Sequence, residues 1–512
     1  MHSGSLGVVD WVFVGAYVLI VFGIGVWATR RSETSDDYFL AGRSVPWLVT
    51  GLSLFATNMS GSTLVGLAGG AYQMGLAVYN YEWTAVVALL ALILFFLPVY
   101  RRLEITTAPE FLEHRFDVRT RQWFSALALV GNVVIDMAGT LYAGALFITV
   151  LLPGLSLPAC VAILALMAGT YAIAGGLRAA VYTDLLQGTL LLIGAGCVAG
   201  AAYGAVGGWA AVEAATAAEA RRLILPMSST VLPWPGLMTG LVLLGVYYWC
   251  INQVIVQRAL AARSLTEARY GALFAGALKL PVLFLMVMPG LFALVLYPQL
   301  GNPDLVFPRL ALDLLPVGVR GVILVAFIAA VVSSVDSILN SASALVTMDF
   351  YATLRPQASE QRLVLVGRIV AASVLLLGAV IAPQIREFSS LWTYLQSALS
   401  YLVPPIVAVF VGGLFSRRIN RKGAFWALAL GSGLGLGLLV LQPSLHFLYV
   451  AALLFVVSTG VMTGVSYATA PPPPQKVEAS LWRASDAHVS PATMGVAAAL
   501  LLAVAGVVGT FW

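Results

Sequence analysis

The chain has 512 residues, of which 60% are hydrophobic and 10% are charged, and its formal net charge is +5. An average soluble domain carries about 25% charged residues, so this composition excludes a soluble multidomain enzyme, a disordered chain and a secreted disulfide scaffold. Long uninterrupted apolar runs, in place of short alternating segments, also exclude a membrane β-barrel. The sequence therefore predicts an integral membrane protein built only from α-helices.

Fourteen segments are long enough to cross a bilayer, for which a helix needs about 20 apolar residues. In chain order they cover residues 7–29, 46–70, 77–100, 122–152, 158–177, 183–205, 236–257, 270–297, 316–348, 363–383, 390–415, 423–442, 446–467 and 491–512. The first is not expected to be a cleaved signal peptide, because it begins with acidic Asp10 and its basic pair, Arg30 and Arg31, follows it.

Basic residues are divided unevenly between the loops. With the amino terminus outside, the inner loops hold 21 of the 27 Lys and Arg residues, the outer loops hold five, and Lys279 lies inside a span. Because Lys and Arg concentrate in cytoplasmic loops, this asymmetry predicts a multi-pass plasma membrane protein with both termini external. The preference for Arg over Lys favours a bacterial inner membrane. The run APPPPQ from Ala470 predicts a stiff inner linker before the last helix.

Several kinds of chemistry find no support in the sequence. No Gly-rich nucleotide-binding loop is present, so neither ATP-driven transport nor nucleotide binding is expected, and nothing indicates a nucleic acid partner. Cys160, Cys197 and Cys250 lie in apolar stretches, which is typical of small buried side chains. The absence of an HExxH motif and of a suitable Ser–His pair means that no enzyme activity is expected.

Five ionisable residues fall within or at the edge of the spans, namely Glu82, Asp136, Asp184, Lys279 and Asp336. A charge at mid-membrane costs roughly 2.5–3.5 kcal/mol on insertion scales, which a purely structural bundle has little reason to carry. Two interpretations stay open. The charges neutralise one another in pairs, for example Lys279 with Glu82 as a clasp between helices, or they line a polar binding cavity.

The second span is interrupted by small and polar residues. Its sequence ATNMSGSTLVGLAGGAY crowds five of them into little more than one turn: Asn58, Ser60, Gly61, Ser62 and Thr63. Such residues favour local unwinding, which frees backbone carbonyls to bind a hard cation, and broken helices at mid-membrane are typical of transporters. The alternative is a face of small residues for close helix packing.

A second polar group lies in the apolar span 316–348. Helical spacing places five of its residues on one face, namely Ser333, Asp336, Ser337, Asn340 and Ser341, with Ser334 beside them. Hydroxyl and carboxylate oxygens suit Na⁺ and suit zinc or copper poorly. Ser hydroxyls can also bond back to carbonyls one turn earlier.

Several strings along the whole chain carry a family resemblance. They are SDDYFLAGRSVPW, NYEW, GGLRAAVYTDLLQ, YYWCINQVIVQRALAARS, LPVGVRGVILVAF and SSVDSILNSASALVTMDFY. In this order they resemble the sodium/solute symporter family, and within it the bacterial sodium/galactose and animal sodium/glucose cotransporter branch. The resemblance implies a LeuT-type fold of five-plus-five inverted repeats, with one extra helix before them and three after.

The implied division of the chain has five parts. They are an N-terminal helix and inner loop over 1–45, a first repeat over 46–206, an outer loop over 207–235, a second repeat over 236–416, and C-terminal helices with the Pro-rich inner linker over 417–512.

The resemblance also implies the residues of a site where the broken helices meet. The sodium ligands would be the carbonyls of Ala56, Met59 and Ala330 with the hydroxyls of Ser333 and Ser334. The substrate residues would be Asn58, Glu82, Lys279, Ser337 and Gln396. The inner gate would be Tyr248 with Trp249 beside it, and the outer lid would be Leu67, Tyr81 and Trp392.

At some positions this chain has a residue type that differs from that of the sugar carriers. Thr63 stands in place of a longer polar side chain, Asp136 and Gly245 in place of amides, and Ala85 in place of a hydroxyl. Asp136 and Thr63 still count among the substrate-binding candidates.

An acid stands at Asp336, where the glucose and galactose carriers generally have a small uncharged residue. Some family members bind a second Na⁺ with an acid at the position of Asp184 and hydroxyls at those of Ser333, Asp336 and Ser337. The sequence therefore predicts a second cation there, either Na⁺ or a shared proton.

Together these features predict a sodium-coupled secondary active symporter that imports a monosaccharide or related polyol by alternating access, with Na⁺ as the coupling ion at one site or two. The expected partners are this small polar solute and the lipid bilayer. Two alternatives stay open: a sodium symporter for another small polar solute, such as an inositol or an acid sugar, and a transporter-like sensor.

Overall fold

Helices make up the fold throughout the part of the chain that the computed structural model describes, residues 7–29, 35–152, 154–388, 390–441 and 444–512. No β-strand occurs among these residues, and two isolated bridges are the only β-type pairs there. The predicted all-α fold class is confirmed. Arg30 and Arg31, placed by the sequence in the first inner loop, lie outside the described residues.

The elements fall into two runs along the chain. The first contains α1 (Val8–Thr29), α2 (Ser35–Leu40), α3 (Trp47–Asn58), α4 (Gly61–Met74), α5 (Asn80–Ala91), α6 (Leu97–Arg102), α7 (Glu110–Arg115), α8 (Val118–Gly131), α9 (Ala138–Leu151), α10 (Leu157–Val206) and α11 (Trp209–Ala215). The second contains α12 (Trp234–Gly236), α13 (Val242–Val246), α14 (Gln253–Leu260), α15 (Leu265–Lys279), α16 (Met288–Leu296), α17 (Val306–Leu314), α18 (Val319–Ala344), α19 (Ala352–Leu354), α20 (Glu360–Ile381), α21 (Leu391–Leu402), α22 (Pro404–Phe415), α23 (Arg421–Leu441), α24 (Phe447–Ala468), α25 (Pro474–Ser480) and α26 (Pro491–Thr510).

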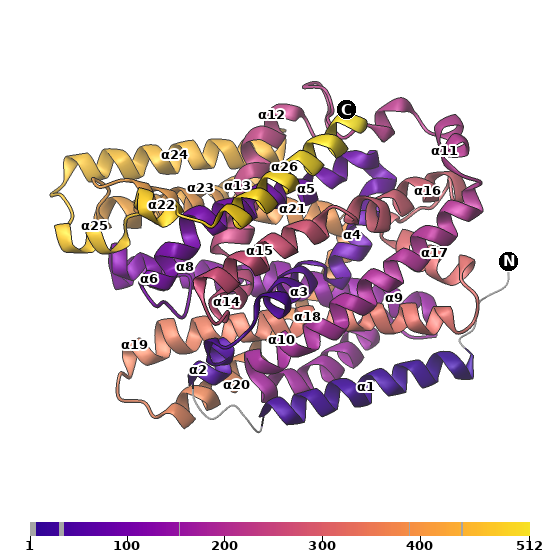
Figure 1. The fold of residues 1–512 in the computed structure, drawn as a ribbon, viewed down its shortest axis with the longest axis horizontal. Coiled ribbons are helices and arrows are strands. Elements are labelled where there is room, and N and C mark those ends of the chain that lie inside the picture. The colour runs from indigo at the N-terminus through magenta and orange to yellow at the C-terminus, as the bar shows by residue number, and fades with distance from the viewer. Residues whose placement is uncertain (1–6, 30–34, 153, 389, 442–443) are drawn as a thin grey trace.

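The long helices run broadly along the longest axis of the molecule (Figure 1). Short elements cap the two ends, with α19 and α25 at one end and α11 and α17 at the other (Figure 1). Loops that the sequence assigned to the inner side therefore gather at one end of the bundle, and loops assigned to the outer side gather at the other. We call these the inner and outer ends.

Nine helices in the described residues are long and apolar enough to cross a membrane, and two bent pairs pass the same test together. The pairs bend by 43° between α15 and the segment 283–296, and by 49° between α21 and α22. Each predicted span is covered mainly by helical residues in the described part of the chain, although 46–70 is divided between α3 and α4, and 158–177 and 183–205 both lie within α10. The count of fourteen stays a prediction, because α3 and the first part of α10 are shorter than a full span.

The two predicted spans 158–177 and 183–205 both lie within α10, which reverses direction along its length. Leu164 and Val331 both pack against Gly144. Asp184, twenty residues later, accepts a hydrogen bond from Ser333, two residues beyond Val331. Since twenty residues of straight helix would cover about 30 Å, the chain must turn back between Leu164 and Asp184. Two spans therefore share one continuous run of helical residues.

Helix α18 lies at the centre of the bundle and α26 at its edge. In the most apolar stretch of the long helix that begins at Val319, 94% of residues are buried, against 17% for α26. A membrane protein can expose apolar side chains to lipid, so what marks the centre is that it buries polar groups. The serines and the acid of the span 316–348 thus face other helices.

Candidate functional site

The second span is broken where its sequence predicted. Helix α3 ends at Asn58, and Met59 leaves the helical conformation with φ −83° and ψ 65°. Ser60 then begins α4 as its N-cap, accepting a hydrogen bond from the backbone N–H of Thr63 at 3.0 Å. The last four carbonyls of a helix lack an intrahelical partner. Here the Phe55 carbonyl accepts the Met59 N–H at 2.8 Å and the Asn58 carbonyl accepts the Thr63 hydroxyl at 2.8 Å, which leaves the carbonyls of residues 56 and 57 as candidate ligands.

The break lies against α18. A Cβ added to Gly61 would stand 2.4 Å from a methyl carbon of Val331, so α4 begins in direct contact with that helix. One step along α18, the Ser334 hydroxyl donates to the Ala330 carbonyl at 2.8 Å. The predicted sodium ligands therefore occupy two adjoining segments and are all at most 3% exposed: Ala56, Met59, Ala330, Ser333 and Ser334.

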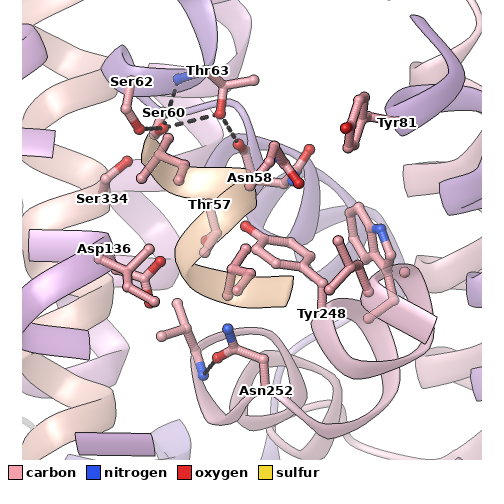
Figure 2. A pocket seen from close by; sticks show the side chains of 18 of the residues that line it. Thr57, Asn58, Ser60, Ser62, Thr63, Tyr81, Asp136, Tyr248, Asn252 and Ser334 are labelled. Carbon is pink, nitrogen blue, oxygen red and sulfur yellow. Dashed lines mark hydrogen bonds between the residues drawn. The ribbon is translucent and has the colours of Figure 1, made fainter. Parts of the chain in front are cut away.

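A cavity of about 130 Å³ opens beside the break. Most of the residues predicted to bind substrate line it, namely Asn58, Thr63, Glu82, Asp136, Tyr248, Trp249, Ser337 and Gln396, and so do Tyr81, Trp392 and Ser334. Figure 2 shows Tyr248 with its hydroxyl end directed toward Asn58, and Asp136 and Ser334 on the neighbouring wall. The structure thus gathers on one cavity residues that are up to 338 positions apart in the sequence, from Asn58 to Gln396.

Lys279 stands behind this wall and does not line the cavity. Its ammonium group donates to the Glu82 carboxylate at 2.7 Å and also to the Asn58 side chain. It is fully buried and lies 5.0 Å from the centre of the Trp249 ring. The clasp and the cavity are therefore one arrangement, in which Lys279 holds two lining side chains in place and compensates the charge of Glu82.

Aromatic rings close the cavity on the side of the predicted outer lid. The rings of Tyr81 and Trp392 meet edge to face at 5.0 Å. Gly66 of α4 packs directly against the Trp392 ring, because a Cβ added there would stand 2.8 Å from a ring carbon. Leu67, the third predicted lid residue, is fully buried in the described structure and does not line the cavity.

On the opposite side, the predicted inner gate rings of Tyr248 and Trp249 meet edge to face at 5.4 Å. They belong to a π-helical turn, Tyr247–Ile251, which ends at Asn252. Asn252 adopts an extended conformation with ψ 123°, and its side chain caps α14 by accepting from Val254 N–H at 2.9 Å. The predicted span 236–257 is therefore broken here, which the sequence analysis did not anticipate.

Arg258 is the functional candidate that the sequence analysis missed. It had been counted with the inner-loop arginines, whereas the structure buries it to 1% exposure. Its guanidinium lies 3.4 Å from Asp184 and donates to the Ser337 hydroxyl. Asp184 also accepts from Ser53 at 2.5 Å and from Ser333. The available signal was an arginine only two residues beyond the mainly apolar string YYWCINQVIV.

The residues predicted to hold a second cation are thus brought together around a positive charge that the chain itself supplies. Asp184, Ser333 and Ser337 are linked directly or through Arg258. Asp336 is fully buried, and one of its oxygens accepts from the Asn340 amide at 3.0 Å. Its other oxygen has no hydrogen-bond partner in the described structure.

Further polar residues line the cavity without having been predicted. They include Thr57, Ser60, Ser62, Thr84, Thr140 and Asn252. Thr140 stands about one turn from Asp136, so helical spacing from that predicted acid would have pointed to it.

Broken helices that meet at a buried polar cavity inside a membrane-spanning bundle define a class of protein, the helical secondary transporters. Comparison with known proteins specifies the class further. The model of the sodium:solute symporter family matches residues 38–431. The human sodium/myo-inositol cotransporter 2 is 37% identical, with 91% of this chain and 77% of that protein covered. Sodium/glucose cotransporter 2 of Rattus norvegicus is also 37% identical, with 91% and 79% covered. The chain belongs to the sodium:solute symporter family.

Solved structures agree on the fold. A Na⁺-coupled sialic acid symporter superimposes with a TM-score of 0.81 at 24% identity, covering 91% of this chain and 99% of that one. Mhp1, a nucleobase-cation-symport-1 family transporter, superimposes with a TM-score of 0.59 at 15% identity, with 88% and 98% covered. The fold is therefore of the LeuT type, as the resemblance implied.

Proposed function

We propose that this protein is a sodium-coupled symporter that imports a monosaccharide or a related polyol. One observation carries the proposal: Ser334, bonded to the Ala330 carbonyl beside the α3–α4 break, lines the same cavity as Asn58, Glu82 and Gln396. A cation at the break and a solute in the cavity would then be neighbours. Binding of one would favour binding of the other, which is the requirement for coupling.

The proposed sodium site consists of the carbonyl oxygens of Ala56, Met59 and Ala330 with the hydroxyls of Ser333 and Ser334. All five ligand atoms are oxygens, which suits a hard cation. No group of three or more His, Cys, Asp or Glu side chains in the described residues could hold a metal ion. That finding favours a monovalent cation bound by carbonyls and hydroxyls over a transition metal.

The proposed solute is polyhydroxylated. Glu82 can accept hydrogen bonds, and Asn58 and Gln396 can both accept and donate them, which matches hydroxyl groups that do both. Tyr248 and Trp249 supply flat rings against which a sugar or inositol ring can pack. The relatives named above carry glucose and myo-inositol in their names, so both substrate types belong in any test.

A second cation is proposed near Asp336. Asp184 and Asp336 are both fully buried, and Arg258 is the basic side chain beside Asp184. Two carboxylates and one guanidinium leave one negative charge uncompensated at low dielectric, which is costly. A second Na⁺ or a proton shared by the acids would remove that cost. Charge-to-solute stoichiometry tests the idea: a ratio above one that falls to one in Asp336→Ala supports it, and a wild-type ratio of one at every pH contradicts it.

The remaining sequence predictions belong to this proposal. The repeats would cover 46–206 and 236–416, and the protein would lie in the plasma membrane with both termini external. A transporter is not expected to catalyse a chemical reaction. Closure of the Tyr81–Trp392 lid and opening past Tyr248 would alternate during transport.

Reconstitution into liposomes tests the proposed function. Purified protein is given an inward Na⁺ gradient and a panel of labelled hexoses, pentoses, inositols and sialic acid. We expect uptake of at least one polyol that stops when K⁺ replaces Na⁺ or when an ionophore collapses the gradient. Sodium-driven uptake of sialic acid alone would show that the substrate is an acid sugar and not a neutral polyol. Sodium-dependent binding without uptake of any solute would favour a sensor and contradict the symporter.

A further inference from the structure

A second and larger cavity lies at the outer end of the bundle, away from the transport site. Its volume is about 720 Å³, and none of its lining residues lines the central cavity. Its walls come from the end of α10, from α11, from the segment 284–292 and from the end of α26, with residues 218–222 at its rim. We call this cavity the outer groove. It is absent from the sequence predictions and from the proposed transport mechanism.

The floor of the outer groove is aromatic and apolar. Tyr203 of α10 and Phe292 of α16 pack with ring centres 5.8 Å apart, and Trp209 meets Phe511 at 6.2 Å. Tyr203 is 47% exposed and Phe284 is 49% exposed, although both belong to segments that cross the membrane. These exposed rings leave part of the apolar floor open at the surface of the bundle.

Glycine keeps part of the groove empty. A Cβ added to Gly200, which lines the groove, would meet no atom within 4 Å. A larger side chain can therefore be placed there without displacing the fold, and it would occupy space inside the groove. Gly204, one turn further along α10, is equally open but does not line the groove.

The rim of the groove is positively charged. Arg221 and Arg222 both line it. Arg221 donates to the Glu213 backbone carbonyl at 2.6 Å, while the Glu213 carboxylate accepts the indole N–H of Trp209 at 2.8 Å. Neither arginine forms an ion pair with a carboxylate in the described residues. The lining of the groove thus carries two guanidinium groups against one carboxylate, that of Glu213, beside an apolar floor.

We propose that the outer groove binds an anionic glycerophospholipid from the leaflet at the outer end. The phosphate group would lie against Arg221 and Arg222, because guanidinium groups pair well with phosphate oxygens. An acyl chain would lie along the aromatic floor past Gly200. A basic rim at headgroup level that continues into an apolar floor at bilayer depth matches one molecule carrying both chemistries. Trp209 and Tyr203 are the residue types that concentrate at this level of a membrane.

Such a lipid would bridge the end of α10 with α16 and α26. Helix α10 also carries Asp184 and contacts the sodium-site helix α18 through Ser333. Occupancy of the groove would thus stabilise the protein as a whole, independently of whether Na⁺ or a polyol is bound.

Lipid titration of the purified full chain in detergent tests this proposal without any transport assay. The probes are short-chain phosphatidylglycerol and phosphatidylcholine, and the readouts are thermal stability and lipid adducts in native mass spectrometry. We expect phosphatidylglycerol to raise the melting temperature at lower concentrations than phosphatidylcholine. Arg221→Gln and Arg222→Gln should each weaken the apparent affinity for phosphatidylglycerol roughly fivefold.

Matched variants separate the groove from general charge and packing effects. Gly200→Leu should abolish the stabilisation by phosphatidylglycerol, whereas Gly204→Leu should leave it unchanged. Arg386→Gln, which removes an exposed arginine elsewhere on the predicted outer side, should also have no effect. Equal responses to the two lipids, or a response that survives Gly200→Leu, would overturn the proposal. If a protein copurifies with the wild type but not with Gly200→Leu, the groove binds a helix of that partner and the lipid proposal is wrong.

Discussion

At the scale of single residues, Ser334 offers the most direct test of sodium binding. Its hydroxyl lies 2.8 Å from the Ala330 carbonyl and faces the cavity. Ser334→Ala removes one proposed ligand oxygen, and we expect a several-fold rise in the Na⁺ concentration that gives half-maximal uptake. The expression level and melting temperature should stay near wild type, because no other helix depends on this hydroxyl. Unchanged sodium dependence in both Ser334→Ala and Ser333→Ala would contradict sodium binding at this site.

Gln396 tests the solute side of the cavity. We expect Gln396→Ala to weaken solute binding by roughly 1–3 kcal/mol, because hydroxyl groups of the ligand would lose their partner. Isothermal titration at saturating Na⁺ measures this effect. Leu399→Ala, at another lining position with an apolar side chain, is the matched control and should cost less. An equal loss in the two variants would indicate a change of cavity shape instead of lost hydrogen bonds.

Residue types in the sequence predicted much of the cavity wall, since Asn58, Glu82 and Gln396 all line it. The sequence could not distinguish a lining residue from a supporting one. Lys279 and Glu82 are both ionisable residues within spans, yet only Glu82 reaches the cavity. Arg258 was missed because a basic residue near a predicted span end is normally a loop residue. Its burial depends on Asp184, a partner 74 positions away.

At the scale of elements, close contact between helices α4 and α16 depends on one glycine. A Cβ at Gly290 would stand 2.1 Å from the Ala68 carbonyl oxygen and 2.7 Å from the Ala71 side chain. Gly290→Ala therefore forces the two helices apart, and we expect a loss of roughly 1–3 kcal/mol in stability. Thermal unfolding in detergent measures it.

The control for this contact is Gly433→Ala on α23, where an added Cβ meets nothing within 4 Å. Because alanine favours helix more than glycine does, this variant should be at least as stable as wild type. A stability for Gly290→Ala equal to that of Gly433→Ala would show that the α4–α16 contact can relax freely.

A buried acid outside the spans ties α21 to the outer loop between α16 and α17. Asp304 is 2% exposed, and its carboxylate accepts the Leu391 N–H at 3.0 Å. Burial raises the pKa of Asp304 to about 6, although the hydrogen bond from Leu391 acts in the opposite direction. The folded protein therefore prefers the protonated acid. This contribution to stability is complete below the unfolded pKa of about 3.9 and is lost as the pH rises through 6.

Because protonated Asp304 is the form that the folded protein prefers, the stability of the protein should fall as the pH rises. Between pH 4.5 and 7 the wild-type protein should lose roughly 2 kcal/mol of stability that Asp304→Asn does not lose. Melting temperatures of both proteins across this range measure the difference. Parallel curves for the two proteins would mean that Asp304 does not titrate in this window. Asp313→Asn, at a more exposed acid of α17, serves as the control.

The sequence analysis found one of the helix breaks and missed others, and the local residue types explain the difference. The break at Met59 was visible because small and polar residues interrupt an apolar run. The bends after Lys279 and at Val403 lie within long apolar segments, but proline marks both of them, with Pro281 after the first and Pro404 and Pro405 at the second. Proline lacks a backbone N–H and bends a helix, so these bends had a local signal that the sequence analysis did not use. The break at Asn252 has a capping residue, but the flanking residues of YYWCINQVIV continue the apolar run without a gap. The break at Asn252 is therefore the one of these three whose position the local sequence does not mark by proline.

At the scale of the whole molecule, a group of charges joins helices at the inner end. Arg121 of α8 donates to Asp349, which follows α18, at 2.6 Å. It also contacts Glu113 at 2.6 Å and Glu110 at 3.1 Å. Asp349 is fully buried and accepts from Thr107 at 2.6 Å as well. This cluster holds the loop around Thr107 and helices α7 and α8 against the continuation of the sodium-site helix.

Alternating access makes this cluster part of an equilibrium between the two ends. Asp349→Asn removes the fully buried charge from the Arg121 pair, so we expect the inner end to open more often. Amide hydrogen exchange in residues 104–117 should rise at least tenfold, which corresponds to roughly 1.4 kcal/mol. Exchange in residues 297–305 at the outer end should fall, because one end closes as the other opens.

The control is Glu113→Gln, which removes a partner of Arg121 that is 40% exposed. Water and salt screen such a charge, so its loss should change exchange by a small factor. Faster exchange at both ends in Asp349→Asn would indicate general unfolding and contradict the linked equilibrium. A rise at the inner end with a fall at the outer end cannot come from lost stability alone. That opposite pair of changes would therefore identify the cluster as a closure of the inner end that the transport cycle must break.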